Sequence, residues 1–136
     1  MPVLARVACM PATTSRSLVV LRLAAAVSAA LSLVQALLAF LSLGKVARLI
    51  EPHGIIGDVN LLVMVIAAVA AVIWFRKGGS RGLMMHAIGM AVIFLVQIGL
   101  GEAELKWPHI IIGIVAVIGS IALAVMAYSK PAAATA

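Results

Sequence analysis

Four apolar stretches, each about as long as a bilayer is thick, divide this sequence. They cover residues 23–43, 54–75, 82–101 and 109–129, and short charged segments separate them. A helix needs about 20 apolar residues to cross the hydrocarbon core, whereas a barrel strand needs about half that length and alternates polar with apolar residues. These stretches do not alternate. The sequence therefore predicts an all-α integral membrane protein, built as a four-helix bundle.

The composition leaves little of the chain outside the bilayer. Of the 136 residues, 65% are hydrophobic and only 10% are charged, which is incompatible with the mixed charged surface of a soluble domain. Most of the surface must therefore face the lipid bilayer. We expect one transmembrane domain over residues 18–129, between a disordered cytoplasmic leader, residues 1–17, and a cytoplasmic tail, residues 130–136. Cys9 is the only cysteine, which rules out an internal disulfide.

The basic residues predict how the chain is oriented, because Lys and Arg that flank membrane segments are retained in the cytoplasm. In a four-span chain one side is strongly basic and the other is close to neutral. We therefore expect a multi-pass protein of the cell (plasma) membrane with both ends in the cytoplasm. The net charge of +6 is then explained without nucleic-acid binding, and we expect no nucleic acid as a partner. The basic side holds Arg6, Arg16, Arg22, Arg76, Lys77, Arg81 and Lys130.

A short internal repeat links the second and fourth stretches. Residues 52–57 read Pro-His-Gly-Ile-Ile-Gly and residues 108–113 read Pro-His-Ile-Ile-Ile-Gly, so that five of six positions agree. The tripeptide Leu-Val-Gln likewise occurs at 33–35 in the first stretch and at 95–97 in the third. We interpret the chain as two tandem helical hairpins related by a pseudo-twofold axis along the membrane normal. This symmetry places the second helix opposite the fourth.

The repeated histidines suggest a haem site. His53 lies four residues before Gly57, and His109 four before Gly113, so each pair shares one face of its helix. Two facing imidazoles can hold haem iron, and a glycine beside each lets a planar ligand approach the backbone. We therefore expect His53 and His109 to bind the iron of haem b. Supporting residues are Gln35 and Gln97, facing inward from the first and third helices, and Lys45, Arg48 and Lys106, which can pair with the propionates.

Two other readings of the sequence remain open. A histidine after a proline can simply begin a helix at the interface, and small residues four apart can simply let helices approach closely. The chain would then be a cofactor-free subunit or assembly factor of a larger complex. Alternatively, it is a small dimeric exporter, although Asp58, near the outer end of the second stretch, is a poor substitute for the deep acidic residue expected there. His86, near the cytoplasmic end of the third stretch, has no matching partner among the histidines.

Residues 20–129 resemble one four-helix half of the haem A synthase family. The resemblance rests on Glu51-Pro52-His53 with Gly57, on the Gln-Ile-Gly-Leu-Gly run at 97–101, and on His109. It implies a histidine pair on the second and fourth helices, with Glu51 as the catalytic carboxylate of an oxidoreductase.

The chain also departs from the family pattern. Glu51 is two residues before its histidine rather than three, Glu102 replaces a glycine, the loop cysteines are missing, and one half is present instead of two. These departures concern catalysis more than haem binding, so whether the chain is an enzyme stays open. A homodimer would restore eight helices. We expect a b-type haem protein in electron transfer, or in haem handling for oxidase assembly, with respiratory complex subunits as possible partners.

Overall fold

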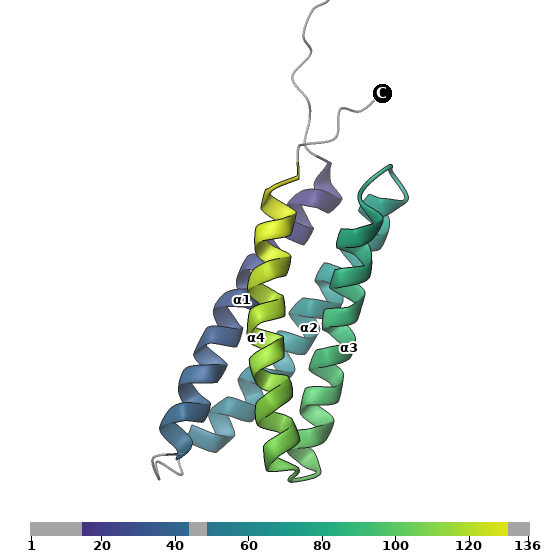
Figure 1. Ribbon diagram of the computed structural model, residues 1–136. Coiled ribbons are helices and arrows are strands. Elements are labelled where there is room, and N and C mark those ends of the chain that lie inside the picture. Colours follow the sequence, from purple (N-terminus) through teal and green to yellow (C-terminus); the bar gives the residue numbers. More distant parts are fainter. Residues whose placement is uncertain (1–14, 44–48, 131–136) are drawn as a thin grey trace, which may run out of the picture.

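The computed structural model describes residues 15–43 and 49–130, and this part of the chain is entirely helical (Figure 1). Helix α1 covers Arg16–Leu43, α2 Ile50–Phe75, α3 Arg81–Glu102 and α4 Lys106–Tyr128. All four are long and apolar enough to cross a membrane. The predicted membrane-embedded four-helix architecture is therefore confirmed. Residues 1–14 of the leader, residues 131–136 of the tail, and Lys45 and Arg48 lie outside the described residues.

The helices are longer than the apolar stretches that predict them. Helix α1 begins at Arg16 rather than at residue 23, and it includes two residues assigned to the leader from the sequence. The backbone N–H of Leu18 donates to Ser15 Oγ at 3.3 Å, and Ser17 and Leu18 are buried. Hydropathy marks the part of a helix that lies in hydrocarbon, whereas the helix itself continues into the polar interface. The helical part of the chain therefore begins before the apolar stretch does.

Each helix packs against two neighbours. Helix α1 contacts α2 and α4, and α3 contacts the same two helices, so α2 and α4 lie diagonally opposite each other. The ends of α1 and α4 meet at one end of the bundle, where Arg22 donates to the backbone oxygens of Ala127 at 3.1 Å and Lys130 at 2.6 Å. Figure 1 shows α1 beginning and α4 ending at this end. The two described ends of the chain therefore lie at the same end of the bundle.

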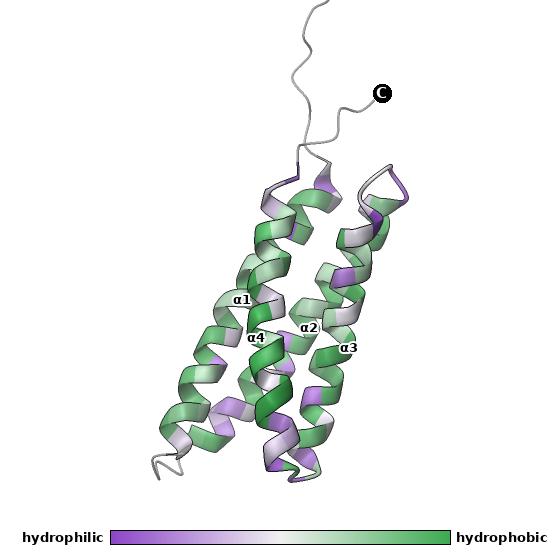
Figure 2. Ribbon diagram, viewed as in Figure 1, coloured by the Kyte–Doolittle hydropathy of each residue, from purple (hydrophilic) through white to green (hydrophobic). Residues whose placement is uncertain are grey.

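Small side chains fill the interior, and large apolar side chains cover the outside. Alanines supply half of the buried hydrophobic residues, whereas Phe40 and Ile118 are 73% and 63% exposed. Figure 2 shows apolar residues dominating the middle of all four helices, with polar residues gathered at the ends. Small residues let transmembrane helices approach closely, and large ones suit lipid. Near the chain termini the interior contains four fully buried leucines, namely Leu18, Leu21, Leu83 and Leu123.

The turn between α3 and α4 brings the end of one helix directly to the start of the next. The backbone N–H of Leu105 donates to Leu100 O at 3.0 Å, and Glu104 adopts a left-handed conformation with φ 56°. Many helices end in this way, with a left-handed residue just after the last turn and a backbone hydrogen bond that closes over it. Glycine is the residue that normally takes the left-handed position. The tight turn places the first residues of α4 beside the last turn of α3.

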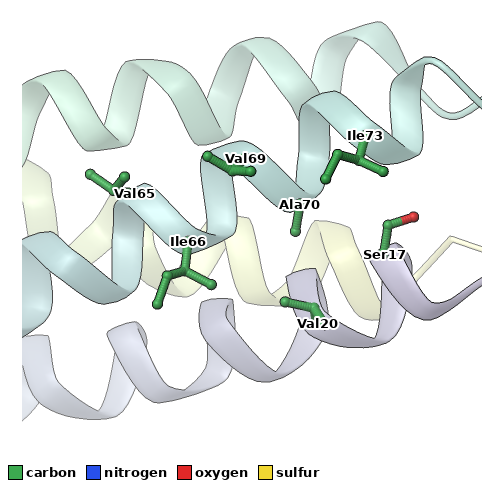
Figure 3. A pocket seen from close by; sticks show the side chains of 7 residues that line it. All are labelled: Ser17, Val20, Val65, Ile66, Val69, Ala70 and Ile73. Carbon is green, nitrogen blue, oxygen red and sulfur yellow. The ribbon is translucent and has the colours of Figure 1, made fainter.

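An apolar cavity of about 260 Å³ lies between α1 and α2, on the half of the bundle nearer the chain termini. Figure 3 shows its seven side chains, of which only Ser17 has a polar atom. The cavity therefore offers no group for chemistry, and the candidate site is elsewhere. Its lining consists of Ser17, Val20, Val65, Ile66, Val69, Ala70 and Ile73.

Candidate functional site

The two repeated histidines occupy the same position in their helices. Helix α2 begins two residues before Pro52 and α4 begins two residues before Pro108, so that each histidine is the fourth helical residue. A proline is tolerated in the first turn because its missing N–H would have no helical partner there. Although α2 and α4 lie diagonally across the bundle, the rings of His53 and His109 meet, with centroids 5.9 Å apart and planes at 64°.

Each histidine is fixed at its backbone by a glutamine from the preceding helix. Gln35 Nε2 of α1 donates to the carbonyl oxygen of His53 at 2.8 Å, and Gln97 Nε2 of α3 donates to that of His109 at 2.9 Å. Both glutamines therefore face the interior of the bundle. Their side chains hold α1 to α2 and α3 to α4 at the depth of the histidines.

The glycine one turn after each histidine leaves room for the glutamine that bonds to that histidine. A Cβ atom at Gly57 would lie 2.9 Å from Gln35 Nε2, and one at Gly113 would lie 2.9 Å from Gln97 Nε2. Real Cβ atoms do not approach other atoms so closely, so an alanine at either position would require the glutamine amide to move away from its place. The sequence predicted this space for the plane of a ligand. In the structure the glutamine amide occupies it.

The two imidazole rings differ in their own hydrogen bonds. His109 Nδ1 lies 2.9 Å from the carbonyl oxygen of Gln97, which can only accept, so Nδ1 carries the proton and Nε2 keeps its lone pair. The ring also packs on Gly101, where a Cβ would lie 3.2 Å from His109 Cε1. His53 Nδ1, by contrast, is buried without a hydrogen-bond partner. The ring of His109 is thus held in orientation by its own hydrogen bond to the backbone of Gln97.

Both rings line one cavity, which lies at the ends of α1, α2 and α4 away from the chain termini. Its volume is about 260 Å³. Lys106 lies in its wall, where an ammonium group can pair with an anionic ligand. The remaining lining residues are Ala39 and Ser42 from α1, Ile50 from α2 and Ile110 from α4. The structure thus brings His53, His109 and Lys106 together around one space.

Other residues singled out from the sequence lie apart from this cavity. The side chains of Glu51 and Asp58 are exposed on α2, and neither belongs to the cavity lining. His86 of α3 bonds through Nε2 to the carbonyl oxygen of Gly119 of α4 at 3.0 Å. This contact gives His86 a packing role between two helices, which agrees with its lack of a histidine partner.

A buried polar cluster, which we call the serine–asparagine cluster, lies next to the site and extends toward the middle of the bundle. It consists of Ser28 and Ser32 from α1, Asn60 from α2 and Ser120 from α4, all at most 2% exposed. Asn60 Nδ2 donates to Ser32 Oγ at 3.0 Å, and Ser32 Oγ and Ser120 Oγ are 3.1 Å apart. The sequence places Asn60 and Ser120 on the histidine faces of their helices. It does not single out the α1 serines, although their spacing of four residues within an apolar stretch is a usable signal.

Comparison of the chain with protein-family models, with curated proteins and with solved structures found no match. The assignment of the site therefore depends on its own chemistry. Among the described residues, no three His, Cys, Asp or Glu side chains are grouped so that they could hold a metal ion. The site is a pair of imidazoles, a donor set that suits a metal already held by another ligand, such as the four nitrogens of a porphyrin.

Proposed function

We propose that this protein is a b-type haem-binding membrane protein that acts in electron transfer or in haem handling for respiratory oxidase assembly. The main support is that the imidazoles of His53 and His109 meet across the bundle at 5.9 Å. Two metal–nitrogen bonds of about 2 Å each, together with the ring radii, put the centroids of an axial pair about 6 Å apart. The observed separation agrees with this value.

The residues around the rings fit the same proposal. His109 is held as the tautomer in which Nε2 can ligate iron, because Nδ1 donates to Gln97 O. Lys106 can pair with a propionate. Bound haem would supply one-electron chemistry, while the protein orients it and excludes water. Because the cavity of about 260 Å³ is below the roughly 300–1,000 Å³ of common ligand pockets, the surrounding helix ends must separate to admit a macrocycle.

We further propose that the two helical hairpins are duplicated units related by a pseudo-twofold axis. Three paired features support this: the helix start two residues before proline, the glutamine bond to the histidine carbonyl, and the glycine beneath the amide. The resemblance to one half of a haem A synthase belongs to the same proposal. Under it, Glu51 would act only in the enzymatic version, and a homodimer would supply the second half.

A specific observation favours a second candidate function, a cofactor-free subunit or assembly factor. The spaces above Gly57 and Gly113 are filled by glutamine amides, which gives both glycines a purely structural use. This candidate needs the glutamines and glycines but not the imidazole rings. The two proposals therefore differ in what they require of His53 and His109.

The visible spectrum of the purified protein tests the haem proposal. Protein expressed with ample haem should show a b-type α-band in the reduced minus oxidised spectrum. Replacing both histidines, as His53→Ala with His109→Ala, should abolish the band, whereas His86→Ala is the matched control and should keep it. Colourless wild-type protein would rule out the haem proposal and favour the cofactor-free one.

A further inference from the structure

We propose that His53 and His109, in the packing of this structure, form a binding site for a single monovalent copper ion, Cu(I), coordinated by Nε2 of each ring. The inference goes beyond the proposed haem function and does not depend on it. Its starting point is the space between the rings. The cavity of about 260 Å³ has room for a bare ion, whereas a porphyrin would require the helix ends to separate. The spaces beside Gly57 and Gly113 are also filled, by glutamine amides.

The first observation is the direction of the two rings. Nδ1 of His109 donates to the backbone oxygen of Gln97 at 2.9 Å. Nδ1 of His53 is buried, and the backbone of Gln35 interacts with that ring. Both rings line the cavity, and Nδ1 and Nε2 lie on different sides of an imidazole. Each ring therefore turns its Nε2 toward the shared space.

The second observation is the separation of the rings, whose centroids are 5.9 Å apart. Two metal–nitrogen bonds of about 2 Å each, together with the ring radii, put the centroids about 6 Å apart when the rings lie on opposite sides of one ion. The angle of 64° between the ring planes is compatible with this arrangement, because each ring can turn about its own metal–nitrogen bond. The helices thus already provide the spacing that an in-line pair of ligands needs.

The third observation is the choice of metal that the surroundings allow. Among the described residues, the cavity lining has no carboxylate or thiol, and no three possible metal ligands are grouped together. Zinc sites need about four ligands, whereas Cu(I) is stable with two in line, and imidazole is a common ligand of copper. Lys106 in the cavity wall repels a divalent ion more strongly than a monovalent one. These features together favour Cu(I).

Metal binding by the purified, haem-free protein tests the site. In a Cys9→Ser background, which removes the only thiol, the protein should bind one Cu(I) per chain in competition with bicinchoninate. His53→Ala and His109→Ala should each weaken binding at least about tenfold, and the matched control His86→Ala should bind like the parent. Equal binding by all these proteins, or no binding by the parent, would overturn the inference.

X-ray absorption of the Cu(I)-loaded parent tests the same site in case a histidine variant fails to fold. It should show two imidazole nitrogens at about 2 Å from copper, whereas a sulfur neighbour would place the ion on methionines and overturn the inference. Zinc should bind at least about tenfold more weakly than Cu(I), and equally tight zinc binding would overturn the choice of metal.

The haem proposal and this inference can fail separately. Protein that shows a b-type band but binds no Cu(I) without haem would overturn this inference alone. Colourless protein that binds Cu(I) through His53 and His109 would overturn the haem proposal alone. Lys106→Gln separates the two further, because it removes a propionate partner and should weaken haem retention, but it should strengthen Cu(I) binding by removing a positive charge. Weaker Cu(I) binding by Lys106→Gln would contradict the inference.

Discussion

Gln97 and His109 are joined by two hydrogen bonds that run in opposite directions. Gln97 Nε2 donates to the backbone oxygen of His109, and His109 Nδ1 donates to the backbone oxygen of Gln97, both at 2.9 Å. Each residue thus fixes the other, one by its side-chain amide and one by its ring. The pair locks the last turns of α3 to the first turn of α4.

The first prediction concerns the glycine beneath this pair. Gly113→Ala should lower the free energy of unfolding by about 1–3 kcal/mol, because its Cβ would overlap the Gln97 amide. Gly99→Ala, on the open side of α3, should change it by less than about 1 kcal/mol. Adding Gln97→Ala to Gly113→Ala should recover part of the loss. Unfolding in mixed detergent micelles compares the wild type, the three single variants Gly113→Ala, Gly99→Ala and Gln97→Ala, and the double variant; a purely additive double variant would contradict the overlap.

The second prediction concerns the serine–asparagine cluster. Asn60→Ala should cost about 1–3 kcal/mol of unfolding free energy, since Asn60 is fully buried and donates to Ser32. Ser32→Ala should cost less in the Asn60→Ala background than in the wild type, because the shared bond is already absent. Ser129→Ala, at an exposed serine that bonds only within α4, is the control. Independent effects of Asn60→Ala and Ser32→Ala would show that the bond contributes nothing.

The third prediction concerns the turn before α4. Glu104 has φ 56°, a conformation that favours glycine, so Glu104→Gly should raise the free energy of unfolding by about 0.5–1 kcal/mol. Glu102→Gly is the control, because Glu102 belongs to the helix and should gain nothing. Thermal unfolding followed by circular dichroism compares the two variants. A loss of stability in Glu104→Gly would mean that the glutamate makes a contact that outweighs the backbone strain.

The fourth prediction concerns orientation. In a Cys9→Ser background, a cysteine introduced as Ser129→Cys should react with a membrane-impermeant maleimide only after the cytoplasmic side is opened. Glu104→Cys should react in intact cells. The expectation follows from the basic residues at the end of the bundle where the chain begins and ends. These include Arg22, Arg76 and Lys130. The opposite labelling pattern would place both ends of the chain outside the cell.

Hydropathy was sufficient to predict the number of candidate membrane-spanning helices, because each helix contains an apolar run long enough to be recognised by itself. The repeat likewise predicted that His53 and His109 line a common space, since both follow a proline in the first turn. What the sequence did not reveal depends on packing between helices. The amide of Gln97 occupies the space beside Gly113. His109 Nδ1 bonds to a backbone oxygen, and because every residue has one, the pattern of side chains in the sequence could not reveal this partner.

The buried leucines near the chain termini limit what this bundle can do. The serine–asparagine cluster lies near the middle of the bundle, and Leu18, Leu21, Leu83 and Leu123 are fully buried between it and the chain termini. Within the described residues, these leucines lie on the path that leads from the histidine cavity toward the ends of the chain. A molecule that binds beside His53 and His109 is therefore expected to enter and leave at the end of the bundle where their cavity lies.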